Sequence, residues 1–205
     1  MDTESCLMLF TRYPKAGNTK TRLIPHLGAT QAAELQRWMT ASMAREMAAL
    51  GPSIERQIHF SGGSLAQMQA WLGRQFTYLP QFAGDLGNRL HQAFLGNFRS
   101  GMGTVVAIGA DCPGLSTRHF EQAFRYLQTY DLVLGPAADG GYYLIGLAQP
   151  QAKLFENIPW GTGEVFERTV AIANTLNLSI AILEQLRDVD RPEDLEILDK
   201  MPICL

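Results

Sequence analysis

The sequence contains no apolar run long enough to cross a membrane. Its first apolar stretch, residues 6–10, is too short for the hydrophobic region of a secretion signal, and no basic segment precedes it. The 3 cysteines, Cys6, Cys112 and Cys204, are odd in number, widely separated and without metal-ligand spacing, which excludes a disulfide framework. We therefore expect a cytoplasmic protein with reduced thiols and no membrane span.

A strong charge of either sign is also missing. The net charge of -3 over 205 residues gives no overall attraction to nucleic acid or to an anionic membrane, so we expect neither as a partner. No internal repeat, low-complexity tract or linker interrupts the chain, which is 46% hydrophobic and 18% charged. These properties predict one globular α/β domain, residues 1–205, whose specificity comes from a local site.

Short apolar or alternating segments indicate strands, and longer segments with helical spacing indicate helices. The predicted strands are residues 5–11, 54–60, 76–79, 104–110, 132–134, 142–147 and 179–183. The predicted helices are residues 30–50, 64–72, 86–98, 117–130, 151–158 and 163–176, with a last helix that begins near Pro192.

The most informative stretch is residues 105–115, VVAIGADCPGL. It places Asp111 directly after a buried strand that Pro113 prevents from continuing. Ligands of open α/β sheets bind at the carboxyl ends of the strands, so Asp111 is the first candidate for the active site. The alternative is an aspartate that caps the helix beginning near Ser116.

A basic loop, residues 12–23 (RYPKAGNTKTRL), follows the first predicted strand. Lys15, Lys20 and Arg22 carry three positive charges within eight positions, and Gly17 permits close approach of the backbone to a ligand. These features suit phosphate groups, although the loop matches neither the P-loop nor the dinucleotide-binding pattern. A solvated basic loop is the alternative.

A second candidate stretch is residues 81–90, QFAGDLGNRL, in which Asp85 and Arg89 stand at the start of a predicted helix. Both side chains are placed to reach the sheet edge that carries Asp111. The alternative for Asp85 is a helix cap.

A third stretch, DLVLGPAADGGYYLIG over residues 131–146, contains Asp139 followed by Gly140 and Gly141. Closely spaced glycines leave a surface without side chains, which suits a flat sugar or nucleotide, but a plain hairpin turn is the alternative. Trp160 lies in a Gly/Pro loop, where its ring either stacks on a ligand or fills space between packed segments. Asp190 is placed as the cap of the last helix.

In this order the segments resemble the radical-SAM/selenodomain-associated transferase family, some members of which are encoded beside arsenosugar biosynthesis genes. The matching segments are residues 10–23, 84–90, 108–115, 134–147, 160–166 and 188–195. KTRL, DCPGL, DGGYYLIG and DVDRPEDL at these relative positions are together specific for the family. Because the family is GT-A-like, the resemblance implies the three-layer α/β/α fold of nucleotide-diphospho-sugar transferases, with a mostly parallel, Rossmann-like sheet.

The resemblance also implies roles for single residues. Asp111 takes the position of the metal-binding aspartate of GT-A enzymes, with Mg²⁺ or Mn²⁺ as the cofactor. The acidic-x-acidic motif of those enzymes is absent here, because Cys112 and Pro113 follow Asp111. A second carboxylate is therefore expected from Asp139 or Asp190. Asp139 is assigned as a catalytic residue and Asp190 as a metal ligand. The residues assigned to the nucleotide and its phosphates are Arg12, Lys15, Gly17, Lys20, Arg22, Asp85 and Arg89. Those assigned to the sugar are Gly140, Gly141 and Trp160.

The expected function is that of a metal-dependent glycosyltransferase with a nucleotide-sugar donor and a small-molecule acceptor. Two alternatives remain open. One is a nucleotidyltransferase that uses a nucleoside triphosphate, similar to molybdopterin guanylyltransferase, and the other is a non-catalytic nucleotide-binding module. Glycosyl transfer is preferred because no glycine-rich P-loop follows the first strand. The donor, the acceptor and the oligomeric state are not assigned.

Overall fold

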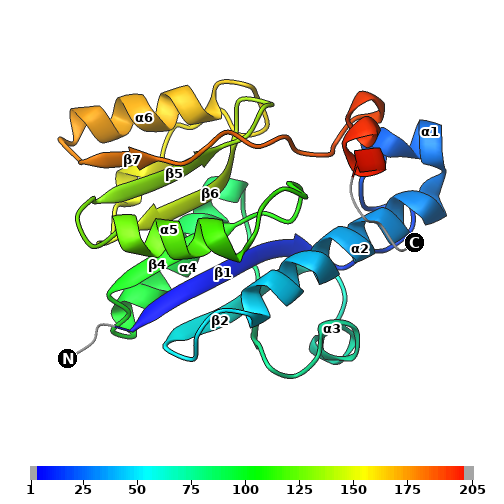
Figure 1. Cartoon of the computed structure of the whole chain (residues 1–205), viewed down its shortest axis with the longest axis horizontal. Helices are drawn as coiled ribbons and strands as arrows, with labels where there is room; N and C mark the ends of the chain where they lie inside the picture. The colour runs from blue at the N-terminus through cyan, green and yellow to red at the C-terminus, as the bar shows by residue number, and fades with distance from the viewer. Residues whose placement is uncertain (1–3, 201–205) are drawn as a thin grey trace.

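The computed structural model describes residues 4–200, which form a seven-stranded, mostly parallel sheet with helices on both faces (Figure 1). The strand order is β3-β2-β1-β4-β6-β5-β7. Strand β6 runs antiparallel to its neighbours β4 and β5, whereas the other pairs are parallel. The strands are β1 (Ser5–Arg12), β2 (Ile54–Ser61), β3 (Thr77–Pro80), β4 (Thr104–Ile108), β5 (Leu132–Pro136), β6 (Tyr142–Leu147) and β7 (Ile180–Ile182). The predicted three-layer α/β/α class is confirmed.

The helices cover the sheet in two layers. One layer contains α2 (Ala29–Ala48), α3 (Leu65–Leu72) and α5 (Thr117–Tyr126), and the other contains α4 (Leu86–Arg99), η2 (Ala152–Phe155) and α6 (Val165–Thr175). The remaining helices are η1 (Thr21–Leu23), α1 (Ile24–Leu27) and η3 (Pro192–Lys200). Across residues 4–200, no helix is long and apolar enough to span a bilayer.

Strand β1 shows why the sheet is buried on both faces. Leu7 and Leu9 join the hydrophobic core under α2, α3 and α5, whereas Cys6 and Met8 join the core under α4 and α6. Successive side chains of a strand point to opposite faces, so an uninterrupted apolar run supplies both cores. Cys6 and Cys112 are buried free thiols, and Cys204 lies outside the described residues.

Several predicted elements differ in length or type. Strand β4 ends at Ile108 instead of residue 110, and α5 ends at Tyr126 in a turn instead of reaching residue 130. The predicted helix 151–158 is a short 3₁₀ helix that ends at Phe155, because Glu156 is extended and Asn157 is left-handed with φ of 56°. The last helix, η3, is also 3₁₀ in type.

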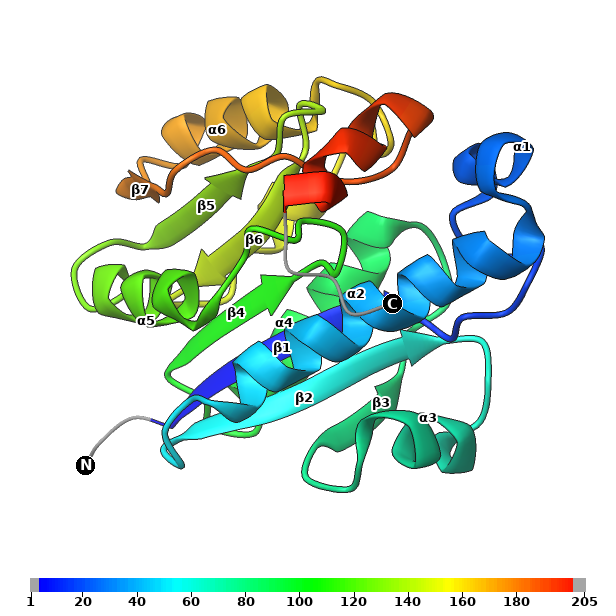
Figure 2. The same cartoon turned by 45° about the vertical axis from the view of Figure 1, so that its right-hand side comes forward.

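The chain after β7 returns across the carboxyl edge of the sheet towards α1 and α2 (Figures 1 and 2). Leu186 donates its N–H to the carbonyl of Pro136 at 3.0 Å, and Val189 donates to the carbonyl of Asp111 at 2.8 Å. The buried Val189 side chain then packs with Leu23 in a small core of its own. Residues 186–191 are thereby placed beside both the basic loop and the loop after β4.

Candidate functional site

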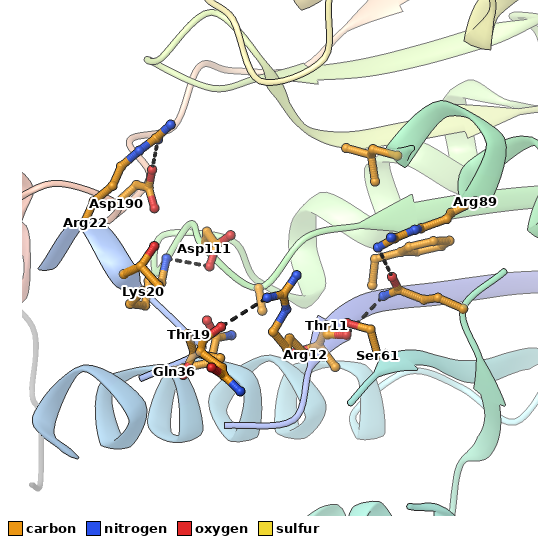
Figure 3. Close-up of a pocket in the computed structure, with 16 residues that line it drawn as sticks. Thr11, Arg12, Thr19, Lys20, Arg22, Gln36, Ser61, Arg89, Asp111 and Asp190 are labelled. Atoms are coloured by element: carbon orange, nitrogen blue, oxygen red, sulfur yellow. Dashed lines mark hydrogen bonds and ion pairs between the residues drawn. The ribbon is translucent and has the colours of Figure 1, made fainter. Parts of the chain in front are cut away.

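A cavity of about 480 Å³ lies at the carboxyl edge of β1 and β4. Its charged lining residues are four cations and two carboxylates: Arg12, Lys20, Arg22, Arg89, Asp111 and Asp190. In Figure 3, Arg22 and Asp190 lie at one end and Arg89 at the other, with Lys20, Asp111 and Arg12 between them. The excess of positive charge makes this cavity suitable for a polyanion such as a diphosphate. We call it the phosphate cavity.

Lys20 connects three segments at the centre of the phosphate cavity. Its ammonium Nζ lies 2.6 Å from Oδ1 of Asp111 and donates to the carbonyl of Val189 at 2.5 Å. The Lys20 side chain is 3% exposed, whereas that of Asp111 is 52% exposed. Lys20 also has a left-handed backbone, with φ of 48°, an uncommon conformation for a residue with a side chain.

Arg22 forms an ion pair with Asp190, although the two residues are far apart in sequence. The side chain of Arg22 is 59% exposed and that of Asp190 is 34% exposed. Among residues 4–200, the Asp190 side chain makes no hydrogen bond to an N–H of η3, so the expected capping bond is not present. The carboxylate of Asp194 in η3 instead reaches back and accepts the N–H groups of Asp190 and Arg191 at 3.1 and 2.8 Å.

The other two cations are held by neutral oxygens. Arg12 donates to the carbonyl of Asn18 at 3.1 Å, and Arg89 donates through Nε to the carbonyl of Gly84 at 2.9 Å. A second bond, from Arg89 to the side-chain oxygen of Gln81, measures 3.3 Å. Neither arginine is neutralised by these bonds, so both present positive charge to a ligand.

Asp111 does not cap α5, which was its alternative role. The N–H of Thr117 is accepted by the carboxylate of Glu46 at 2.8 Å, and the N–H of Ser116 is accepted by Nδ1 of His119 at 3.1 Å. The adjacent Cys112 is buried, and burial together with the negative charge of Asp188 raises the pKa of its thiol. Cys112 is therefore a protonated packing residue, and the Asp111 carboxylate is left to face the cavity.

Several polar residues of the phosphate cavity were missed from the sequence. They are Thr11, Asn18, Thr19, Thr21, Gln36, Ser61 and Gln81. Gln36 carried a usable signal, because it lies on the buried face of α2 among apolar residues and is 7% exposed. Gln81 carried none: its amide donates to the carbonyls of Thr11 and His59 at 3.0 and 2.9 Å, which only the sheet pairing brings together.

A second cavity of about 420 Å³ adjoins the first and shares Arg22 and Asp190 with it. Its wall includes Asp139 and Asp188, and we call it the acidic cavity. Burial and the nearby Asp139 carboxylate, in that order, raise the pKa of Asp188. Asp139 also accepts the N–H of Gly141 at 2.8 Å, which fixes its side chain.

Three predicted phosphate-site residues lie outside both cavities. Lys15 and Gly17 are exposed, and the carbonyl of Lys15 closes the loop by accepting the hydroxyl of Thr19 at 3.1 Å. Asp85 is the N-cap of α4 and accepts the N–H of Asn88 at 2.8 Å. The geometry therefore gives Asp85 the structural role that was its alternative.

The predicted sugar-site residues also lie outside the two cavity linings. A Cβ on Gly140 would stand 2.1 Å from the carbonyl oxygen of Gly163, so this glycine permits the β5–β6 hairpin to pack on the loop before α6. Trp160 is half-buried, with its ring edge-on to Tyr142 at 6.2 Å. Gly141 precedes β6 directly. The two glycines therefore have the contacts of a hairpin turn, and Trp160 has those of a packing residue.

The oxygen donors fit a hard divalent cation. Among residues 4–200, no group of three or more His, Cys, Asp or Glu is arranged to hold a metal ion. Mg²⁺ is usually bound by one or two carboxylates, with water and substrate phosphates completing its shell. Asp111 and Asp190 both line the phosphate cavity and are carboxylates of this kind, although each is paired with a cation.

The fold is that of the nucleotide-diphospho-sugar transferases and cytidylyltransferases. Residues 31–162 match the family DUF2064, described as an uncharacterized protein conserved in bacteria, and the chain belongs to this family. No curated protein matches the chain. The association with radical-SAM proteins and arsenosugar genes stays a prediction from the sequence.

Three solved structures illustrate the likeness. A Desulfovibrio desulfuricans G20 protein, provisionally assigned as a nucleotide-diphospho-sugar transferase, is 34% identical, with a TM-score of 0.91 over 97% of this chain and 87% of that one. The 4-diphosphocytidyl-2C-methyl-D-erythritol synthase of Anaerococcus prevotii has a TM-score of 0.62 at 8% identity, covering 95% of this chain and 96% of that one. Glucosyl-3-phosphoglycerate synthase of Mycobacterium tuberculosis, in complex with Mn²⁺, UDP and glucosyl-3-phosphoglycerate, has a TM-score of 0.56 at 13% identity, covering 97% and 75%.

Proposed function

We propose that the protein is a metal-dependent glycosyltransferase that uses a nucleotide-sugar donor. The observation that carries this proposal is the division of charge between the two adjoining cavities. Four cations and two carboxylates line the phosphate cavity, whereas three arginines and five carboxylates line the acidic cavity. A diphosphate is favoured in the first cavity, and an uncharged group rich in hydroxyls, such as a sugar, is favoured in the second.

The phosphate groups of the donor would be bound by Lys20, Arg12 and Arg22. The Lys20 ammonium has three N–H donors, two of which contact Asp111 and Val189, so one remains for a phosphate oxygen. The guanidinium of Arg12 keeps further N–H groups beside the single bond to Asn18. Charge-assisted bonds of this kind stabilise the negative charge that develops on a diphosphate leaving group.

Asp111 and Asp190 would hold Mg²⁺ or Mn²⁺. A bound divalent cation supplies Lewis-acid neutralisation of the leaving diphosphate. The complex of the M. tuberculosis synthase with Mn²⁺ and UDP supports such a cofactor on this fold.

The acidic cavity would bind the donor sugar. Asp139 and Asp188 present carboxylate oxygens that accept hydrogen bonds from sugar hydroxyls. In the transfer, the bond between the anomeric carbon and the diphosphate oxygen breaks, a bond to the acceptor oxygen forms, and the acceptor hydroxyl loses its proton. Carboxylates that hold the sugar and cations that hold the diphosphate therefore act on opposite sides of the bond that breaks.

A nucleotidyltransferase is the second candidate, favoured by the likeness of the fold to the A. prevotii synthase. In that reaction the phosphate cavity would bind a nucleoside triphosphate, and pyrophosphate would leave. We place either activity in a single domain, residues 1–205, in the cytoplasm.

The proposal is tested by incubating the protein with Mn²⁺ and UDP-, GDP-, ADP- and dTDP-hexoses and measuring nucleoside diphosphate by chromatography. We expect release from at least one donor, and loss of that release in Asp111→Asn, which removes a charge but little volume. Asp131→Asn is the matched control, because Asp131 lies at the amino end of β5 and contacts Ser179. No release from any donor, together with no pyrophosphate release from a nucleoside triphosphate and a sugar phosphate, would favour the non-catalytic alternative.

A further inference from the structure

Both carboxylates of the phosphate cavity are paired with cations from one short segment of the basic loop. Lys20 contacts Asp111, and Arg22 contacts Asp190, with only Thr21 between the two cations (Figure 3). These are the two carboxylates that would hold the divalent cation of the proposed function, on which the present inference rests. The same loop is therefore bound to the acids that the cofactor needs.

The position of Lys20 is fixed more firmly than an exposed ion pair requires. Its side chain is 3% exposed, and its ammonium is shared between the Asp111 carboxylate at 2.6 Å and the Val189 carbonyl at 2.5 Å. Its left-handed backbone, with φ of 48°, directs the side chain inwards from the start of η1. Arg22 is 59% exposed and hence freer to move.

Two positive groups cannot share one carboxylate without repulsion. At a separation of about 4 Å, the energy between charges near a protein surface changes the equilibrium by more than a factor of ten. We propose that Lys20 and Arg22 are internal counter-ions, which a divalent cation must displace from Asp111 and Asp190 unless an anionic diphosphate first draws them away.

This arrangement couples the two ligands. A diphosphate that accepts hydrogen bonds from Lys20 and Arg22 loosens their contacts with Asp111 and Asp190, which raises the affinity of those carboxylates for the metal. Coupling between two binding events is reciprocal, so bound metal raises the affinity for diphosphate by the same factor. The loop thus disfavours binding of the metal alone.

The test uses two separate titrations of the full chain. Mn²⁺ binding is measured from the electron paramagnetic resonance signal of free Mn²⁺, and pyrophosphate binding is measured by calorimetry without divalent metal. Pyrophosphate is chosen because it carries the diphosphate and no base or sugar. The variants are Lys20→Met, which keeps the length of the buried side chain, and the exposed Arg22→Gln. The matched control is Lys15→Met, which removes a charge from the same loop outside both cavities.

We expect Lys20→Met to bind Mn²⁺ about tenfold more tightly than the wild type and pyrophosphate about tenfold more weakly. Arg22→Gln should shift both affinities in the same directions by about threefold, because exposed ion pairs are weaker. Lys15→Met should change either affinity by less than about twofold. If Lys20→Met does not fold, the comparison of Arg22→Gln with Lys15→Met decides the question.

Other results of the same titrations would contradict the proposal. Unchanged or weaker Mn²⁺ binding in both cavity variants, with binding in the wild type that Asp111→Asn abolishes, overturns the counter-ion role and leaves the proposed function intact. Absence of Mn²⁺ binding from every variant overturns the counter-ion role, and absence of Mn²⁺ binding in the presence of pyrophosphate as well overturns the metal dependence of the proposed function. Unchanged pyrophosphate affinity in Lys20→Met overturns the coupling.

Discussion

Asp111 and Asp190 differ from Asp139 and Asp188 in their electrostatic partners. Asp111 and Asp190 each contact a cation, whereas Asp139 and Asp188 lie near each other. A carboxylate beside a cation is suited to a site that also receives a metal and phosphates. A carboxylate that is beside another carboxylate and fixed by a backbone N–H is better suited to the hydroxyls of a neutral ligand.

Replacement of Asp139 by alanine tests this division of roles. Loss of a charge-assisted hydrogen bond to the sugar costs about 1.5–3 kcal/mol, so turnover of the sugar nucleotide should fall by about 10–100-fold. Affinity for the bare nucleoside diphosphate, measured by calorimetry, should change by less than about twofold, because Asp139 does not line the phosphate cavity. Equal losses for both ligands would place Asp139 on the phosphates.

A buried histidine predicts how stability depends on pH. Burial lowers the pKa of His59 from 6.5 to about 4. Between pH 6.5 and 4 the unfolded chain binds a proton at this position and the folded chain does not, so the free energy of unfolding falls as the pH falls. The effect is at most about 3 kcal/mol. Urea unfolding at pH 7 and pH 4.5 should show a smaller loss in His59→Gln than in the wild type, and equal losses would contradict the assignment.

At the scale of elements, helix α4 shows that a capping aspartate and a site residue can stand close together in sequence, so that sequence alone does not separate their roles. Asp85 caps the helix, while Arg89, one turn later, lines the phosphate cavity. We expect Asp85→Ala to lower the free energy of unfolding by about 1 kcal/mol, measured by urea denaturation. Pyrophosphate affinity should be unchanged, and Asp85→Ser should restore stability. A loss of affinity in the folded Asp85→Ala protein would return this residue to the site.

Two glycines give a paired prediction for the packing of elements. Gly140 has φ of 87° and lies against Gly163, whereas a Cβ on Gly96 in α4 meets no atom within 4 Å. Gly140→Ala should destabilise the fold by about 2 kcal/mol or more, through strain and overlap with backbone. Gly96→Ala should stabilise it by about 0.5–1 kcal/mol. Thermal unfolding of both variants measures this contrast, and similar shifts would contradict it.

The sequence predicted elements best where their ends carry strong signals. Helix α2 ends at Ala48, two residues before its predicted end and shortly before the terminators Gly51 and Pro52, and α3 ends at Leu72 with Gly73 as its C-cap, as predicted. Helix α5 was predicted too long, because Leu127 continues the apolar spacing although the chain turns there towards β5. Periodicity describes one face of a helix and contains no information about such a turn.

At the scale of the whole molecule, the site forms where distant segments meet at the carboxyl edge of the sheet. The general rule for open α/β sheets predicted that Asp111 faces this edge. It did not predict the contact of Lys20 with Val189, which depends on the return of the chain after β7. It also did not separate Asp139 from the phosphate cavity, because local sequence does not fix the distance between two loops at one edge.

Transfer of a sugar from a nucleotide donor is the reaction that we propose for this protein. The most direct measurement identifies the leaving group from a donor and acceptor mixture with Mn²⁺, by chromatography for nucleosides and by an enzymatic assay for pyrophosphate. Glycosyl transfer predicts nucleoside diphosphate and no pyrophosphate, with release lost in Asp111→Asn. Pyrophosphate from a nucleoside triphosphate and a sugar phosphate, also lost in Asp111→Asn, would contradict the account and identify a nucleotidyltransferase.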